Sequence, residues 1–178
     1  TSETHGVTGI DPDTGSILWE LPSVLPARVV GSPVLANDLV ISACGKGSTG
    51  NQLVAVQIPP GNGGAPPRLV YTHMGRSTPY VTTPLAKDGL LYTFHDQGEV
   101  CCLRVDTGKL LWSEKPAGRF YGAPVWVNGL LYCIDRQGKV VVLAAEPTYK
   151  LLAVNSLGGI YGADTSRLKP ALPQDGHF

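Results

Sequence analysis

Residues 83–122 read TPLAKDGLLYTFHDQGEVCCLRVDTGKLLWSEKPAGRFYG, and residues 123–162 read APVWVNGLLYCIDRQGKVVVLAAEPTYKLLAVNSLGGIYG. The two stretches align without a gap, and 13 of 40 positions are identical. The shared positions include Gly-Leu-Leu-Tyr, which occurs at 89–92 and again at 129–132. A gapless period of this length indicates duplicated structural units that stack on one another.

Two further copies of the unit lie upstream. A longer copy carries its extra residues in two Gly/Pro-rich loops, at 45–51 and 59–67. A partial copy, GVTGIDPDTGSILWE, opens the chain and places Trp19 in register with Trp112. We therefore expect a partial unit, three full units and an irregular tail, at residues 5–31, 32–82, 83–122, 123–162 and 163–178.

Each full unit is expected to form four short strands. In the unit quoted first they fall at about 83–87, 90–95, 99–104 and 109–114. An Asp-Gln-Gly turn joins the second strand to the third. Asp106-Thr107-Gly108 makes the next tight turn, because Asp and Thr can bond nearby backbone and Gly accepts a positive φ. Four-stranded units of about 40 residues predict an all-β fold, a β-propeller segment of about three and a half blades. A β-sandwich would not predict the gapless period.

A large side chain recurs at one place in each unit, after the Asp-Thr-Gly turn or its counterpart. One such side chain per sheet fits between stacked sheets, and its burial contributes about 1.5–3 kcal/mol or more. The structural residues expected from this pattern are Trp19, Tyr71, Trp112, Asp106 and Gly108, with Leu152 in the last unit.

An arc of three and a half blades leaves two unpaired ends, which proteins normally cover. Two arrangements would cover them. The chain is either a fragment whose missing blades belong to a longer chain, or one part of a homodimer in which a second chain completes the ring.

The composition excludes several partner classes. Charged residues make up 16% of the chain and the formal net charge is zero, so no bulk attraction to nucleic acid or to an anionic membrane is expected. The sequence holds no run of 18 apolar residues and therefore predicts no membrane span. The four cysteines and four histidines lie at no spacing typical of a metal site.

The repeated motifs resemble a known family. IDPDTGSILW and LRVDTGKLLW share one signature, and SPVLANDLVI, TPLAKDGLLY and APVWVNGLLY share a second. Both are similar to the repeats of the PQQ-like (pyrroloquinoline quinone) β-propellers, over roughly residues 5–162. The resemblance is closer to the non-catalytic members of outer membrane biogenesis than to the quinoprotein dehydrogenases. It implies an extracytoplasmic location, in the periplasm or cell envelope, and a protein-binding or scaffolding role.

The loops that return from an outer strand to the next inner strand carry the candidate partner-binding residues. In a propeller all such loops emerge on one face, and Arg and Tyr are enriched at interface hot spots. The alternative is that the Arg side chains are solvated and the Tyr side chains wedge between blades. The candidates for binding a protein or peptide are Arg28, Arg76, Tyr80, Arg119, Phe120, Tyr121 and Tyr161, and His73 lies beside them in the sequence.

Catalytic chemistry finds little support. The acidic residues fall mostly in turns, and CGKGSTG (44–50) lacks the first glycine of a phosphate-binding loop. We expect no cofactor and no metal. The alternative function is a fragment of a PQQ-dependent alcohol or sugar dehydrogenase. It would require PQQ, a calcium site of Glu, Asn and Asp, and a catalytic Asp.

Cys101 and Cys102 are adjacent, as in the vicinal disulfide that some quinone-dependent dehydrogenases carry beside the cofactor. The repeat register places this pair in mid-strand, where successive side chains point to opposite faces. A turn at Gln97-Gly98 would pair Thr93 with Cys102 and place Cys102 on the same side as Cys133. That register allows a Cys101–Cys133 contact and argues against a Cys102–Cys133 contact. Two small buried thiols, Cys101 and Cys102, are the default expectation.

Overall fold

The computed structural model describes residues 1–47, 50–60, 65–75 and 78–157, and this part of the chain is all β. A two-stranded half-blade consists of β1 (Val7–Ile10) and β2 (Ile17–Leu21). The first blade consists of β3 (Val34–Ala36), β4 (Leu39–Cys44), β5 (Gln52–Gln57) and β6 (Arg68–Met74). The second blade consists of β7 (Leu85–Lys87), β8 (Leu90–Phe94), β9 (Val100–Arg104) and β10 (Leu110–Glu114). The third blade consists of β11 (Val125–Val127), β12 (Leu130–Ile134), β13 (Lys139–Ala144) and β14 (Leu151–Ser156).

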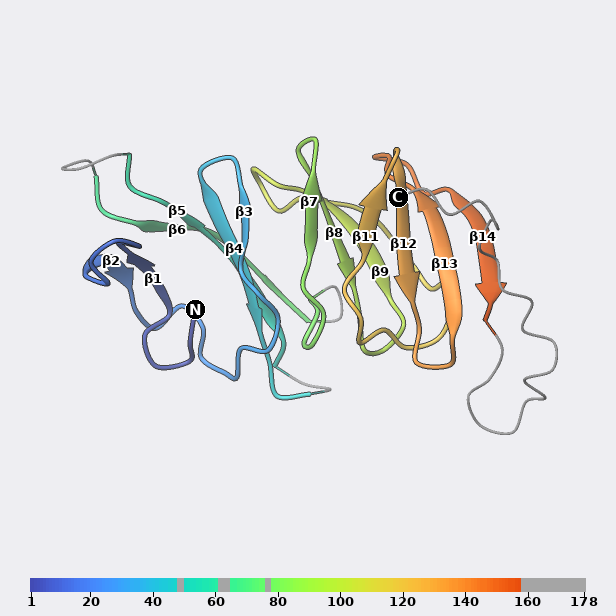
Figure 1. Ribbon diagram of the computed structural model, residues 1–178, viewed down its shortest axis with the longest axis horizontal. Helices are drawn as coiled ribbons and strands as arrows, with labels where there is room; N and C mark the ends of the chain where they lie inside the picture. The colour runs from blue at the N-terminus through green and yellow to red at the C-terminus, as the bar shows by residue number, and fades with distance from the viewer. Residues whose placement is uncertain (48–49, 61–64, 76–77, 158–178) are drawn as a thin grey trace.

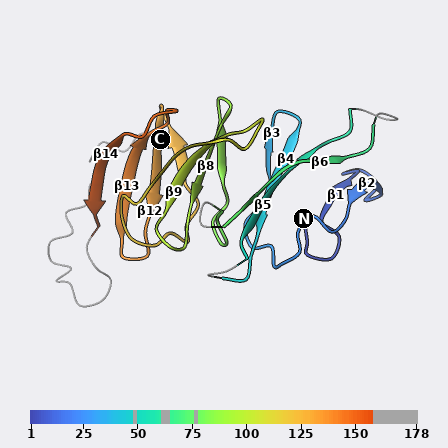
Figure 2. The same ribbon diagram turned by 180° about the vertical axis from the view of Figure 1, so that it is seen from behind.

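The sheets stand side by side in an arc, with the half-blade at one end and the third blade at the other (Figures 1 and 2). Strands within each sheet are antiparallel and follow chain order across it. The first strands of neighbouring sheets, β3 and β7, approach each other, which places them on the inner side of the arc. The predicted all-β propeller segment is therefore confirmed. The predicted tail, residues 163–178, lies outside the described residues.

The Asp-Thr-Gly turns owe their shape to local hydrogen bonds. Gly108 has a φ of +66°, and its N–H donates to the carbonyl of Arg104 at 2.9 Å. In the half-blade the Asp11 carboxylate accepts the N–H of Asp13 at 2.8 Å, and Gly15 donates to the Asp11 carbonyl at 2.8 Å. Because these bonds are all local, the same short motif forms the same turn in two different blades.

Buried clusters fill the spaces between successive sheets. The main members between the half-blade and the first blade are Val7, Leu25, Val54 and Val56. Between the first and second blades they are Ile41, Ala55, Cys101 and Leu103. Between the second and third blades they are Tyr92, Phe94, Cys102, Leu131, Cys133 and Val141. Each sheet therefore has two buried faces wherever it has two neighbours, as stacked propeller blades require.

The recurring large side chain reaches across to the next blade. The Tyr71 hydroxyl donates to the Val105 carbonyl at 3.0 Å, and its ring lies over Gly108, where an added Cβ would come within 2.6 Å of a ring carbon. Trp112 packs against Tyr149 with ring centroids 5.2 Å apart and donates its indole N–H to the Glu146 carbonyl at 3.4 Å. Trp19 packs against the cluster between the half-blade and the first blade.

The predicted register around the cysteines is wrong by one residue. Thr93 pairs with Cys101 rather than Cys102, because the hairpin turns through three residues instead of two. His95 N–H donates to the Glu99 carbonyl at 2.9 Å, and Gly98, at φ +89°, donates to the His95 carbonyl at 2.9 Å. This arrangement is the three-residue hairpin with a left-handed glycine.

The correct register reverses the expectation for cysteine contacts. Cys102 and Cys133 belong to the same buried cluster, whereas Cys101 belongs to the cluster on the other side of its sheet. The Cys101–Cys133 contact that the expected register allowed is therefore excluded. All four cysteines of the chain are buried free thiols, including the adjacent pair Cys101 and Cys102.

Candidate functional site

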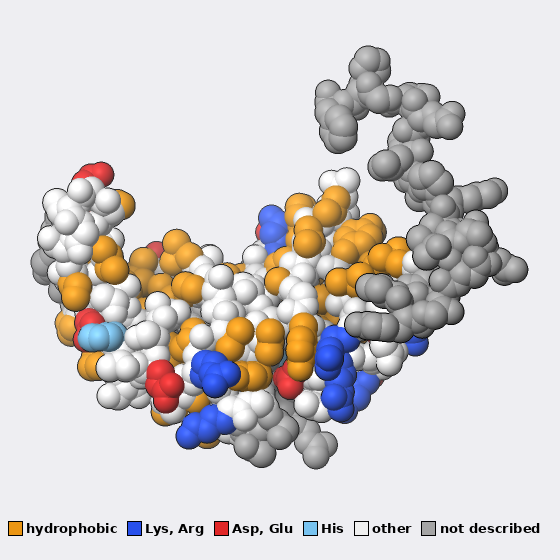
Figure 3. Space-filling model, turned by 60° about the horizontal axis from the view of Figure 1, so that its bottom comes forward, with side chains coloured by type: hydrophobic (Ala, Val, Ile, Leu, Met, Phe, Trp, Pro, Cys, Tyr) orange, Lys and Arg blue, Asp and Glu red, His pale blue; other side chains and the backbone are white. Residues whose placement is uncertain are grey.

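The loops between blades and the hairpins that join the second and third strands of each sheet emerge together along one edge of the arc. We call this edge the loop face, and its described residues are 22–33, 44–47, 78–84, 94–99, 115–124 and 134–139. It lies at the bottom of Figure 1, and Figure 3 turns it forward. In that view Lys and Arg side chains gather in groups beside exposed hydrophobic ones.

Backbone hydrogen bonds hold two of the described loops, 22–33 and 115–124, against neighbouring hairpins. Gly45 N–H donates to the Arg28 carbonyl at 3.0 Å, and Arg136 N–H donates to the Arg119 carbonyl at 2.8 Å. Phe120 N–H donates back to the His95 carbonyl at 3.0 Å, so this loop is fixed to both blades that it connects. The loops are thus extensions of the sheets rather than free segments.

Asp135 anchors the loop between the second and third blades. Its carboxylate is buried, and Oδ1 accepts the backbone N–H groups of Gln137 and Lys139, both at 2.8 Å. Oδ2 accepts the N–H of Gly118, at 3.2 Å, from the loop itself. Three charge-assisted hydrogen bonds satisfy a carboxylate that would otherwise be costly to bury.

Two Arg–Tyr pairs lie on the loop face. Arg28 Nη1 donates to the Tyr80 hydroxyl at 3.3 Å, which joins loops of successive blades. The Arg136 guanidinium lies over the Tyr121 ring, 4.6 Å from its centroid, in a cation–π contact. Tyr121 is 49% exposed, and Arg119 beside it is exposed as well. Planar aromatic and guanidinium groups are thereby presented to solvent on a fixed backbone.

The exposed charge of the loop face is mainly positive. Exposed cationic side chains come from Arg28, Lys46, Lys115, Arg119, Arg136 and Lys139. Of the acidic side chains at this end, Asp96 and Asp135 are buried, Glu99 is half-buried and Glu114 is exposed. A neutral chain therefore carries a local cationic surface at one end.

The structure does not bring all the sequence candidates to this surface. Phe120 is fully buried and packs edge-on against Phe94 with centroids 5.2 Å apart, so its ring is part of the core and cannot contact a partner. His73 lies within β6 and contacts the Gly108 carbonyl of the next blade. Arg76 and Tyr161 lie outside the described residues.

Arg136 is a residue that the sequence reasoning missed. It sits in the hairpin between β12 and β13, whereas all the candidates predicted from the sequence were expected in loops between blades. The bridge that pairs Phe120 with Asp135 brings this hairpin beside the loop. The signal available in the sequence was the repeat itself, because second-to-third-strand hairpins and interblade loops share one end of any propeller.

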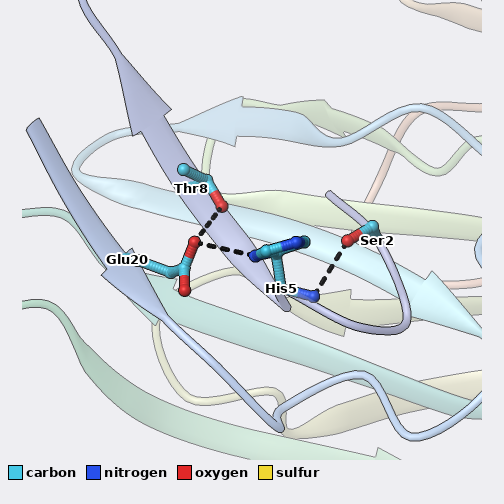
Figure 4. A network of polar contacts seen from close by, with 4 residues as sticks. All are labelled: Ser2, His5, Thr8 and Glu20. Carbon is cyan, nitrogen blue, oxygen red and sulfur yellow. Dashed lines mark hydrogen bonds and ion pairs between the residues drawn. The ribbon is translucent and has the colours of Figure 1, made fainter. Parts of the chain in front are cut away.

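A second polar cluster lies on the half-blade, and Figure 4 shows it. His5 Nδ1 is 3.3 Å from Glu20 Oε2, and the Thr8 hydroxyl donates to the same oxygen at 3.3 Å. Ser2 completes a set that resembles a hydrolytic triad. However, its hydroxyl accepts the backbone N–H of His5 at 3.0 Å and does not contact the imidazole ring. No nucleophile is therefore activated here.

The buried thiols are poorly suited to redox chemistry. Burial raises the pKa of Cys101 to about 11 and that of Cys102 and Cys133 to about 12, so all three are protonated at neutral pH. Within the described ranges, no three His, Cys, Asp or Glu side chains come together in a way that could hold a metal ion. The same part of the chain holds no helix long and apolar enough to cross a membrane.

Comparison with known proteins places the repeat in context. Residues 72–148 match the family model of outer membrane protein assembly factor BamB. BamB from Moraxella catarrhalis is 20% identical with a TM-score of 0.62, and the match covers 84% of this chain and 43% of that one. No curated protein matches the chain. The chain thus spans less than half the length of that BamB.

Two other solved structures share the fold. A europium-containing methanol dehydrogenase is 14% identical with a TM-score of 0.62, over 89% of this chain and 30% of that one. The computationally designed Ika4 protein is 20% identical with a TM-score of 0.63, over 80% of each chain. At these identities the likeness establishes the propeller fold and leaves the function open.

Proposed function

We propose that this chain, which resembles the PQQ-like repeat β-propellers and their BamB members in particular, is a non-catalytic protein-binding or scaffolding module. The matching family model describes an outer membrane protein assembly factor, so we place the chain in the periplasm or cell envelope with a role in outer membrane biogenesis. Its partner in this proposal is a protein or peptide.

The observation that carries the proposal is the loop face. Arg28–Tyr80 and Arg136–Tyr121 present paired guanidinium and phenol groups on a backbone that is fixed by hydrogen bonds between blades. A rigid surface loses little conformational entropy on binding, which favours recognition of a partner. Arg and Tyr are also the residue types that contribute most at protein interfaces.

The charge of the loop face indicates the kind of partner. Exposed Arg and Lys side chains outnumber exposed acidic ones there, because Asp96 and Asp135 are buried. Complementary charge accelerates association and fixes orientation. We therefore propose a partner segment that combines acidic side chains with apolar ones able to pack against Tyr80 and Tyr121.

The second candidate is part of a PQQ-dependent dehydrogenase. It rests on the shared fold with methanol dehydrogenase, of which this chain covers 30%. Bound PQQ would supply the redox chemistry in that case. The described residues offer no cluster of metal ligands beside which it would act.

Site-specific photo-crosslinking in envelope extracts tests the binding proposal. A crosslinking residue at Tyr121 is expected to capture one discrete protein. A crosslinking residue at Thr148, an exposed position between β13 and β14 on the edge of the arc opposite the loop face, is expected to capture none. Arg119→Glu and Arg136→Glu should reduce the Tyr121 product at least about tenfold, the effect of losing roughly 1.4 kcal/mol. Lys150→Glu, an exposed charge reversal far from the loop face, is the matched control. Equal capture from Tyr121 and Thr148, or no effect of the two Arg variants, would refute the loop face as the binding surface.

A further inference from the structure

Three loops between blades share one pattern of six residues. Residues 28–33, 79–84 and 119–124 read RVVGSP, PYVTTP and RFYGAP. Each ends on a proline that directly precedes the first strand of the next blade, at β3, β7 and β11. The three loops therefore align position by position, and equivalent positions recur once per blade.

The first position of the pattern makes the same backbone contact in two of the loops. The Arg28 carbonyl accepts the N–H of Gly45 at 3.0 Å, and the Arg119 carbonyl accepts the N–H of Arg136 at 2.8 Å. Both donors lie in the hairpin that joins the second and third strands of the blade that the loop enters. Residues that are equivalent in the sequence pattern are thus equivalent in space.

Successive loops lie side by side. Ser32 N–H donates to the Thr83 hydroxyl at 2.9 Å, which joins the fifth positions of the first and second loops. A Cβ built on Gly31 would lie 3.1 Å from the carbonyl oxygen of Thr82, its equivalent one blade further on. The pattern therefore forms a continuous row across these two loops rather than separate patches.

The third position presents an apolar side chain in every loop. Val30 is 47% exposed, Tyr121 is 49% exposed and Val81 is half-buried. Val81 stays accessible although its loop joins two complete blades that each have a neighbour on both sides. The preceding position is directed into the core at Phe120, which is fully buried, and at Val29, which packs against a buried cluster. The loop face thus carries a row of three apolar contacts, one from each loop.

Two exposed arginines accompany this row. Arg28 and Arg119 occupy the first position of their loops, and both are exposed. Neither forms an ion pair with an acidic side chain in the described ranges. Their charges are therefore available to acidic groups of a partner.

We propose that the partner binds the loop face through one extended segment that lies along this row. Its apolar side chains contact Val30, Val81 and Tyr121 in turn, and its acidic side chains meet Arg28 and Arg119. This arrangement rests on the proposed function of the loop face as a protein-binding surface, and it adds the form of the partner. Packed sheets are about 10 Å apart and an extended chain advances about 3.3 Å per residue, so about six residues span the three loops.

Photo-crosslinking from three positions tests the path of the segment. A crosslinking residue is placed at Val30, Val81 or Tyr121 in turn, and mass spectrometry locates the attachment site on the captured protein. All three should capture the same protein, with attachment sites in order within about ten residues of one segment. Capture from none of the three would refute the loop face as a binding surface. Attachment sites in separate regions of the partner, or capture from Tyr121 alone, would overturn only the extended segment.

A synthetic peptide that copies the mapped segment measures each contact by fluorescence anisotropy. Arg28→Glu and Val81→Ser should each weaken binding about tenfold, because one removes a charge contact and the other an apolar contact. Lys109→Glu and Leu110→Ser, at exposed positions on the edge opposite the loop face, are the matched controls and should leave the affinity unchanged. Val81→Thr, of nearly the same shape, replaces Val81→Ser if circular dichroism shows a folding defect. Unchanged affinity of either the Arg28 or the Val81 variant would overturn the proposal.

Discussion

Replacing Trp112 with alanine should destabilise the chain by about 2–4 kcal/mol. Removing a fully buried Trp costs about 3–5 kcal/mol through lost apolar transfer and the cavity that remains. Trp112 is half-buried, so the transfer part is reduced. Its edge-on contact with Tyr149, at 5.2 Å between centroids, contributes about 0.5–1.5 kcal/mol.

Urea unfolding followed by far-ultraviolet circular dichroism measures this loss without using the fluorescence of the deleted residue. All variants must be compared at one protein concentration, because association would add to the apparent stability. Leu110→Ala on the same strand is the control, with a smaller expected loss of about 1 kcal/mol, since Leu110 is 42% exposed. A double-mutant cycle with Tyr149→Ala isolates the contact between the second and third blades. A loss below 1 kcal/mol together with zero coupling would refute the stacking of blades through Trp112.

Three further predictions concern the turn, the anchor and the thiols. Gly108→Ala should destabilise the chain by about 2–3 kcal/mol in urea unfolding, because the residue has a positive φ and the new methyl group meets the Tyr71 ring. Asp135→Asn should cost about 1–3 kcal/mol and speed hydrogen exchange at the Gly118 amide, because one of three backbone donors loses its acceptor. The stability of the chain should fall as pH rises from about 9 to about 11, because burial raises the pKa of Cys101 to about 11 and the unfolded chain loses this proton first. Cys101→Ala should flatten that decline in a series of unfolding curves at different pH.

The repeat predicted the fold because its signals are local. The Asp-Thr-Gly turn forms through bonds among neighbouring residues, and the aromatic position after it follows from the turn. The period then determines that sheets stack, and stacking determines that both faces of an interior blade are buried. None of these steps requires knowledge of a distant contact.

The errors arose where one residue of register or one tertiary contact decides the outcome. A two-residue and a three-residue turn at Gln97-Gly98 leave the same strand pattern, yet they exchange the faces of Cys101 and Cys102. Phe120 sits in a loop whose sequence resembles a surface segment, and only its packing against Phe94 shows it to be core. Arg136 joins the site through the bridge between its hairpin and the neighbouring loop.

The claim that this propeller is a binding module rather than a catalyst is tested most directly by adding PQQ and Ca²⁺ to the purified 178-residue chain. Cofactor absorbance on the protein and reduction of an electron-accepting dye with alcohol or sugar substrates are the two measurements. A binding module should show neither stoichiometric PQQ absorbance nor dye reduction above the rate without protein. Stoichiometric binding together with turnover would contradict the claim and establish the dehydrogenase alternative.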